Sequence, residues 1–195
     1  IIDEINRGNI SKIFGELITL IEKDKRGTYY CTLPYSKKSF TLPDNLYIIG
    51  TMNTADKSIA LLDTALRRRF SFVEIEPSLK VFDNPNFVGK INQINLGALL
   101  QQLNQKIEVK LDRDHRIGHS YFLDIDNLKN LYHVWYYKII PLLMEYFYGD
   151  VNAVQEIIGK DFFGEDGQIK HFDLRRETEA ANFEAGLLKL CAEGS

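Results

Sequence analysis

The first 77 residues alternate between segments in which apolar side chains have helical spacing and segments in which they form short runs. Residues 10–21 carry apolar side chains three and four positions apart, which predicts an amphipathic helix. Residues 46–53 and 70–77 are short apolar runs typical of buried strands. Between them, residues 58–69 place apolar side chains on one helical face and predict a second helix.

Residues 24–45 interrupt this alternation with a segment around a polar tip that is typical of a hairpin or of an extended excursion. Strands that alternate with helices predict an α/β domain in which a parallel sheet has flanking helices on both faces. In such sheets ligands bind outside the carboxyl ends of the strands. Polar residues that directly follow residues 1–2 and 46–50 are therefore the first candidates for a site.

The pattern changes after residue 77. Residues 87–111 and 127–148 predict helices, and Pro141 should kink or divide the second one. We expect the α/β part to cover residues 1–77 and a helical lid-like domain to cover residues 78–160. The remaining residues, 161–195, predict a C-terminal tail that is partly helical.

Composition and charge narrow the possible classes of function. The formal net charge is 24 − 27 = −3, which gives no global support for a nucleic-acid-binding surface. The two cysteines, Cys31 and Cys191, form no CxxC pair, so neither a zinc ribbon nor a disulfide framework is indicated. No signal peptide and no apolar run near eighteen residues is present, so we expect a cytoplasmic protein without a membrane partner.

Two adjacent carboxylates, Asp3 and Glu4, follow the first apolar residues. In a nucleotide hydrolase the first would hold the water shell of Mg²⁺ and the second would orient the attacking water. Neighbouring side chains on a strand point to opposite faces, so the two carboxylates can serve different targets. The alternative is a pair of acidic residues at a helix N-terminus, where the helix dipole favours negative charge.

Asn53 ends the strand predicted over residues 46–53, and Asp56 lies in the polar stretch that follows it. An amide at the end of a buried strand could contact the γ-phosphate or its attacking water. The alternative is that both residues are turn or helix-capping residues, for which Asn and Asp are well suited.

Three arginines, Arg67, Arg68 and Arg69, end the helix predicted over residues 58–69. Positive charge at a helix C-terminus is favourable by itself, so a structural role is one interpretation. The other interpretation is an arginine finger, which a neighbouring subunit would supply to neutralise charge on the transferred phosphoryl group.

Together these residues follow the order of Walker B, sensor 1 and arginine finger in AAA+ ATPases. The resemblance becomes specific in longer stretches of the chain, which read DEINRGNISKIFGELITLIEKDKRG, YIIGTMNTADKSIALLDTALRRRFSFVEIEP and RIGHSYF. These stretches resemble the McrB family, the GTP-dependent AAA+ motor subunits of 5-methylcytosine-specific restriction systems. The similarity covers about residues 1–160.

The resemblance implies a role for each candidate residue. Asp3 and Glu4 would be the Walker B pair, and Asp3 would support Mg²⁺ through water. Asn53 would be the sensor 1 residue, and Asp56 would belong to the MNTAD signature that the family associates with GTP hydrolysis. Arg68 and Arg69 would be the finger candidates.

A phosphate-binding P-loop, G-x-x-x-x-G-K-[ST], occurs nowhere in the chain. The chain also begins inside an apolar strand without a methionine, so we interpret it as a piece of a longer protein whose P-loop lies upstream. Residues 1–195 alone are then expected not to hydrolyse nucleotide. Lys57 follows MNTAD where family members often carry Arg, a change that matters only if a bidentate contact is needed.

Arg116 lies in a polar segment of the lid, DRDHRIGHSYF, and is a candidate for a second nucleotide sensor. His115 and His119 in the same segment do not share a predicted helical face, so we do not expect a metal site there. The aromatic stretch at residues 132–149 could stack on bases, but its helical spacing favours a packed core.

These observations predict a GTPase of the AAA+ class that works as a motor subunit in a homo-oligomeric ring, expected to be a hexamer. It would bind GTP and Mg²⁺, contact DNA through regions outside this chain, and drive DNA translocation and cleavage with an McrC-like nuclease. The alternatives are an ATP-dependent remodeller of proteins of the MoxR or dynein-like kind, and a ring-assembly module that does not hydrolyse nucleotide.

Overall fold

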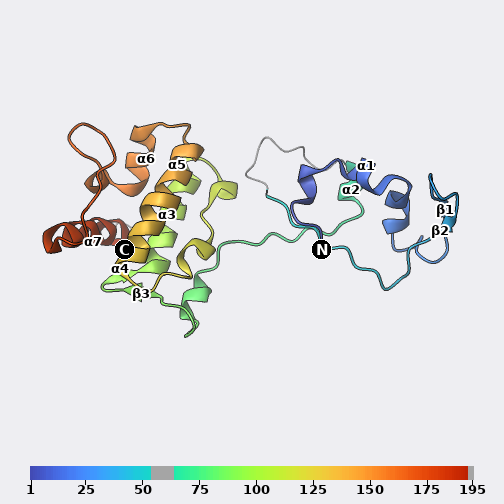
Figure 1. Cartoon of the computed structure of the whole chain (residues 1–195), viewed down its shortest axis with the longest axis horizontal. Helices are drawn as coiled ribbons and strands as arrows, with labels where there is room; N and C mark the ends of the chain where they lie inside the picture. Colours follow the sequence, from blue (N-terminus) through green and yellow to red (C-terminus); the bar gives the residue numbers. More distant parts are fainter. Residues whose placement is uncertain (54–63, 193–195) are drawn as a thin grey trace. The chain divides into compact units, whose positions relative to one another are not determined.

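A computed structural model describes residues 1–53 and 64–192 of the chain. The chain divides into two compact units, Ile1–Glu74 and Ile75–Ser195, and Figure 1 shows the first in blue to cyan and the second in green to red. The first unit contains, in chain order, α1 (Ile10–Phe14), β1 (Cys31–Thr32), β2 (Ser39–Phe40) and α2 (Thr64–Arg67). The second contains β3 (Lys90–Ile91), β4 (Ile94–Asn95), α3 (Leu96–Lys110), α4 (Leu128–Val134), α5 (Ile140–Tyr146), α6 (Val151–Ile158) and α7 (Glu177–Ala192).

The single helix predicted over residues 10–21 is divided at Gly15. The helix α1 ends there, and Gly15–Ile21 continue as a 3₁₀ helix. Gly15 has φ 50° and ψ −128°, a combination that residues with a Cβ rarely adopt. The division therefore follows from the conformational freedom of glycine, which the apolar spacing could not indicate.

The parallel sheet predicted for residues 1–77 is not established in the described residues, where Ile2 and Gly50 form an isolated parallel bridge. The prediction of a strand over residues 70–77 is wrong, because these described residues form no strand. Val73 and Ile75 are 84% and 90% exposed. A strand is held by backbone hydrogen bonds to a neighbouring strand, and residues 70–77 pair with no strand in the described part of the chain.

The other elements of the first unit agree with the sequence. The hairpin predicted within residues 24–45 is confirmed, since β1 and β2 pair antiparallel. Residues 58–63 of the second predicted helix lie outside the described residues, and its last turn is α2. Two small cores hold this unit together, one formed by Ile5, Ile10 and Leu66 and the other by Leu20, Ile21 and Leu42.

The helix predicted over residues 87–111 begins later than its apolar pattern indicates. The residues before it form an antiparallel hairpin of β3 and β4. Asn92 in the turn has φ 51°, a left-handed conformation that Asn tolerates better than most residues. The Asn95 side chain then accepts a hydrogen bond from the N–H of Ala98 at 2.8 Å and caps the start of α3.

The long helix predicted over residues 127–148 is divided, as Pro141 led us to expect. A π-helical turn, Trp135–Ile139, separates α4 from α5, and Pro141 occupies the first turn of α5. Proline has no N–H to donate to the preceding turn, so a helix is often rearranged immediately before it.

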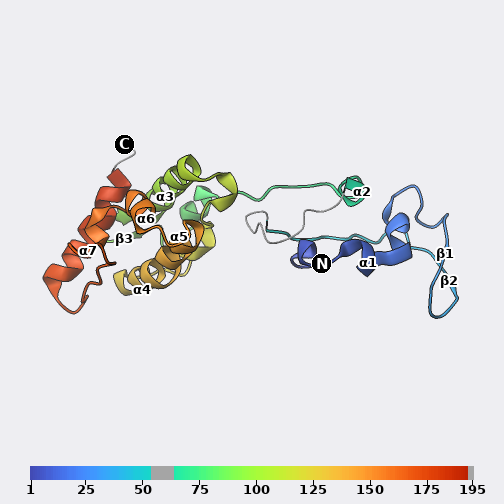
Figure 2. The same cartoon turned by 90° about the horizontal axis from the view of Figure 1, so that it is seen from above.

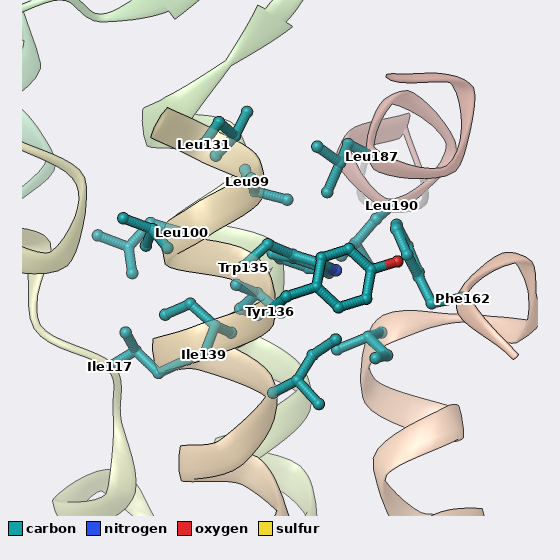
Figure 3. Close-up of a cluster of buried hydrophobic side chains, with 14 of the residues drawn as sticks. Leu99, Leu100, Ile117, Leu131, Trp135, Tyr136, Ile139, Phe162, Leu187 and Leu190 are labelled. Carbon is teal, nitrogen blue, oxygen red and sulfur yellow. The ribbon is translucent and has the colours of Figure 1, made fainter. Parts of the chain in front are cut away.

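The helices of the second unit enclose one hydrophobic core. The helix α3 packs against α6 and α7, and α5 packs against α6, an arrangement that can be followed in Figure 1 and Figure 2. Trp135, which is fully buried, contacts the ring of Phe162 with a centroid separation of 5.1 Å. Figure 3 shows Trp135 and Tyr136 in this core together with Leu187 and Leu190 of α7.

The burial of Trp135 and Tyr136 confirms that the aromatic stretch supplies core residues. The core also includes Phe162, Phe172 and Phe183, so the segment after residue 160 packs with the helices before it. No helix within residues 1–53 and 64–192 combines the length and the apolar character that crossing a membrane requires.

Candidate functional site

The candidate site in the first unit forms where residues 1–6 run beside residues 48–53. The N–H of Ile2 donates to the carbonyl of Ile49 at 2.8 Å, and the N–H of Thr51 donates to the carbonyl of Ile2 at 3.0 Å. Because the two segments run parallel, their carboxyl ends meet at the same edge. The residues that follow, Asp3 and Glu4 on one segment and Asn53 on the other, are thereby brought into the same region.

Thr51 joins the two segments through its side chain. Its hydroxyl donates to Oδ1 of Asp3 and accepts a hydrogen bond from the N–H of Glu4 at 3.0 Å. The apolar and polar pattern of the sequence did not single out Thr51. The signal that could have found it is its position two residues before Asn53, because side chains two apart on a strand share a face.

Glu4 has a left-handed backbone, with φ 48° and ψ 50°. A residue other than glycine pays on the order of 1–2 kcal/mol for this conformation, and here the hydrogen bonds around Thr51 hold it. The Glu4 carboxylate forms an ion pair with the side chain of Arg7. The structure therefore fixes the backbone of Glu4 while its side chain remains 47% exposed.

Asn53 is exposed, and its carbonyl accepts a hydrogen bond from Nδ2 of Asn6 at 3.2 Å. This contact, together with a hydrogen bond from the N–H of Ile5 to the carbonyl of Thr51 at 2.8 Å, extends the pairing of the two segments up to Asn53. Asp56, the other candidate from this stretch, lies outside the described residues.

The arginines after α2 lie in a different part of the first unit. Arg68 and Arg69 line a groove with residues 21–24, Arg26, Asp44 and Tyr47, and Asp3, Glu4 and Asn53 do not line it. Nη2 of Arg69 is 2.7 Å from Oε1 of Glu22. The carboxylates and Asn53 are therefore brought together, whereas the arginines belong to a separate groove.

Arg116 belongs to the second unit, where it contacts the segment that precedes the lid helices. Its Nη2 donates to Oε1 of Glu76 at 3.1 Å, and its Nε donates to the carbonyl of Arg113 at 2.9 Å. Nearby, Nδ1 of His119 accepts a hydrogen bond from the N–H of Ser78 at 3.1 Å. Arg116 and His119 thus hold residues 76–78 against the lid in this structure.

His115 pairs with Asp112, with a distance of 2.7 Å from Nδ1 to Oδ1. This hydrogen bond lowers the pKa of Asp112 below its ordinary value. In the part of the chain that the structure describes, no group of three or more His, Cys, Asp or Glu side chains could hold a metal ion. Oδ1 of Asp112 also accepts hydrogen bonds from the N–H groups of Asp114 and His115 and so caps a short 3₁₀ turn, Arg113–His115.

Two family models match separate parts of the chain. A family model described as the AAA domain (dynein-related subfamily) matches residues 1–70, and one described as the McrB alpha-helical lid domain matches residues 95–155. The type IV methyl-directed restriction enzyme EcoKMcrB subunit of Escherichia coli K12 is 44% identical over 181 residues, which are 82% of this chain and 39% of that protein. The chain belongs to the McrB family.

This McrB family chain is also similar to a component of a different type of restriction enzyme. The type II restriction enzyme BsuMI component YdiS of Bacillus subtilis 168 is 30% identical over 149 residues, which are 67% of this chain and 43% of that protein. The chain spans about two fifths of the length of both relatives.

The two family models divide the candidate residues of this McrB family member. The AAA match includes Asp3, Glu4, Asn53, Arg68 and Arg69, and the lid match includes Arg116. Asp3, Glu4 and Asn53 stand where parallel segments end, the place at which α/β proteins bind ligands. This arrangement can present carboxylate, hydroxyl and amide groups to a polyanionic ligand and its metal ion.

Proposed function

We propose that the full-length protein is a nucleotide-hydrolysing AAA+ motor subunit of a restriction system. The observation that carries this proposal is the parallel pairing of residues 1–6 with residues 48–53, which sets Asp3 and Glu4 beside Thr51 and Asn53. Membership of the McrB family and the AAA match over residues 1–70 support it. The functional unit is a ring of copies of this chain, expected to be a hexamer in the cytoplasm.

Asp3 is the residue that would support Mg²⁺ in this site. Its carboxylate is exposed, and the Thr51 hydroxyl fixes one of its oxygens. Carboxylate and hydroxyl oxygens, with water, are the ligands that Mg²⁺ prefers, so these residues fit the ion. When bound, Mg²⁺ supplies positive charge that stabilises the phosphates during transfer.

Glu4 would accept a proton from the attacking water, and Asn53 would position that water through its amide. The backbone of Glu4 is fixed by the Thr51 hydrogen bond, so the carboxylate pivots from a defined point. Asp56 would order the same loop, and Arg116 would sense the nucleotide from the lid. Release of Arg116 from Glu76 would be part of that step.

GTP is the proposed nucleotide because the chain carries the MNTAD signature, and ATP is the alternative because the AAA match is to the dynein-related subfamily. The two relatives are named as a subunit and a component of restriction enzymes. We accordingly propose that hydrolysis drives DNA translocation and cleavage together with an McrC-like nuclease subunit, and that DNA is contacted by regions outside this chain. Comparing GTP and ATP turnover by the full-length protein separates the two nucleotides.

The test of the proposed function is Glu4→Gln in the full-length protein. Loss of the general base should lower kcat by about 10²–10⁴-fold, while nucleotide affinity, measured by fluorescence titration, stays unchanged. Glu16→Gln, which changes an exposed carboxylate of the same unit, is the matched control and should keep full turnover. Unchanged turnover by Glu4→Gln would reject the assignment.

A further inference from the structure

Arg68 and Arg69 are adjacent in sequence but differ in their surroundings. The Arg69 side chain is 17% exposed and forms an ion pair with Glu22 at 2.7 Å. Arg68 is exposed and lines the groove described above. An arginine that reaches the nucleotide of a neighbouring subunit has to be accessible from outside its own subunit, and of Arg68 and Arg69 it is Arg68 that is exposed.

Glu22 is a well-anchored partner for Arg69. It directly follows the 3₁₀ helix Gly15–Ile21, whose last residue, Ile21, is 4% exposed and packs with Leu20 and Leu42. The carboxylate also pairs with Nζ of Lys25 at 3.4 Å. Because the backbone of Glu22 is fixed by a buried neighbour, its ion pair can hold Arg69 at a defined place.

The chain between α2 and Arg69 is fixed at two points. On one side of Arg68, Leu66 is 2% exposed in the core with Ile5 and Ile10. On the other side, the N–H of Arg69 donates to the carbonyl of Leu66 at 2.9 Å and its side chain is held by Glu22. Arg68 therefore projects from a short segment with both ends anchored.

We propose that Glu22 is a positioning residue, which through Arg69 aims Arg68 at the nucleotide of the adjacent subunit. In this arrangement Arg69 only positions Arg68, and Arg68 alone contacts the nucleotide of the adjacent subunit. The inference rests on the proposed function, and it gives distinct roles to two arginines that the sequence treated as equivalent candidates. It also adds Glu22, a residue that the sequence pattern did not single out.

This geometry predicts an effect on rate and not on substrate affinity. A displacement of about 1 Å in a catalytic group can lower a rate on the order of 10²-fold, whereas an ion pair near the surface contributes little to stability. Loss of the Glu22–Arg69 pair should therefore lower kcat at the adjacent site, with the KM for nucleotide unchanged and the unfolding temperature nearly unchanged.

The experiment mixes two full-length variants so that one supplies the arginine and the other the hydrolytic site. The donor is Glu4→Gln, which cannot hydrolyse at its own site, and the acceptor is Arg68→Ala, which cannot complete its neighbour's site. Each alone should be inactive, and the mixture should hydrolyse nucleotide. An inactive mixture of folded variants, with active wild-type protein, would overturn the role of Arg68.

Glu22→Gln is then added to the donor. We expect kcat of the mixture to fall on the order of 10²-fold with KM unchanged, while Glu16→Gln on the donor, the matched control, has no effect. Glu22→Asp, which keeps the charge, should recover part of the lost activity. Equal activity with Glu22→Gln and Glu16→Gln donors would overturn the inference.

Exchanging the charges of Glu22 and Arg69 tests whether Arg69 positions Arg68 or contacts the nucleotide itself. A donor with both Glu22→Arg and Arg69→Glu keeps the ion pair but removes the guanidinium from position 69, and its mixture should recover activity above that of the Glu22→Gln donor. If the exchange stays as inactive as Glu22→Gln, then Arg69 itself reaches the nucleotide and the inference is wrong. Circular dichroism melting of each donor confirms that the variants are folded.

The same measurements distinguish failure of this inference from failure of the proposed function. Wild-type protein that hydrolyses neither GTP nor ATP would reject both. Wild-type protein that is active, loses turnover with Glu4→Gln and is indifferent to Glu22→Gln would reject only the role of Glu22.

Discussion

At the scale of single residues, Asn104 fixes the segment that carries Arg116. It is 8% exposed in α3. Its Nδ2 donates to the carbonyl of Ile117 at 2.9 Å, and its Oδ1 accepts a hydrogen bond from the N–H of Ile117 at 2.6 Å. One side chain therefore satisfies both polar backbone groups of a buried residue, as a neighbouring strand would do.

Asn104→Ala should lower the free energy of unfolding by about 2–4 kcal/mol, because it leaves the buried N–H and carbonyl of Ile117 without partners. Urea unfolding followed by circular dichroism measures this change. Gln105→Ala, at an exposed position of the same helix, should change stability by less than about 0.5 kcal/mol. Equal stability of the two variants would show that Asn104 does not support this segment.

The side chains at Asp3, Glu4 and Asn53 show how far residue-level prediction reaches. Their position at the ends of two neighbouring segments followed from the apolar runs before them. The Thr51 hydroxyl between Asp3 and Glu4 and the Glu22 carboxylate beside Arg69 did not. Both are contacts between residues 47 or 48 positions apart, and nothing in local sequence specifies which distant side chain will face a given group.

At the scale of elements, the start of α7 is organised by a small ionic network. The Asp173 carboxylate accepts hydrogen bonds from Nε and Nη2 of Arg175 at 2.8 and 2.9 Å, and from its N–H at 3.1 Å. Oε2 of Glu179 accepts a hydrogen bond from the N–H of Asp173 at 2.7 Å. The Glu179 contact ties the segment before α7 to the first turn of that helix.

The Arg175 side chain and N–H hold the pKa of Asp173 at about 2, below its ordinary value of 3.8. A lowered pKa in the folded protein stabilises it above the ordinary value, and this contribution is lost as pH falls from about 4 to about 2. Asp173→Asn should therefore flatten the dependence of unfolding free energy on pH in that window. Urea titrations at several pH values measure it, with Asp124→Asn as an exposed control.

Because Asp173 and Arg175 lie at the surface, we expect only a modest difference between the pH dependence of unfolding free energy of wild-type protein and that of Asp173→Asn. Parallel pH profiles for wild-type protein and Asp173→Asn would contradict the presence of this pair in solution.

The elements themselves were only partly predictable. Apolar spacing gave α3, α4 and α5, because a helix buries one face whatever its partner is. It placed the start of α3 too early, where Asn92 and Asn95 create a turn and a cap. It also joined α1 to the following 3₁₀ turn across Gly15. In each case a few residues with special backbone or capping properties overrode the average pattern.

At the scale of the whole molecule, the segment after residue 160 completes the core of the second unit. Phe183 of α7 is fully buried. The centroid of its ring lies 5.2 Å from the ring centroid of Tyr132, 6.1 Å from that of Phe162 and 5.9 Å from that of Phe172. These contacts join α4 to the segment after residue 160. The segment after residue 160 is thus needed for the stability of the helices before it.

Phe183→Ala should lower the free energy of unfolding of the second unit by about 3–5 kcal/mol, since it removes a ring from a closely packed core and leaves a cavity. Guanidinium unfolding of the full chain, followed by the fluorescence of Trp135, reports on this unit. Asn182→Ala, at an exposed position of α7, is the control. A shift of the unfolding midpoint no larger than that of the control would show that α7 is not part of the core.

The sequence by itself determined the helical character of residues 87–111 and 127–148, the order of the candidate residues Asp3, Glu4, Asn53 and Arg68, and the family resemblance that the comparisons confirmed. These depend on side-chain type and spacing along the chain. Only the tertiary structure decided that Thr51 links the segment that carries Asp3 and Glu4 to the segment that ends at Asn53. It also decided that Glu22 holds Arg69 while Arg68 stays exposed. The reason is that spacing specifies which faces are apolar, whereas polar partners are chosen when distant segments pack together.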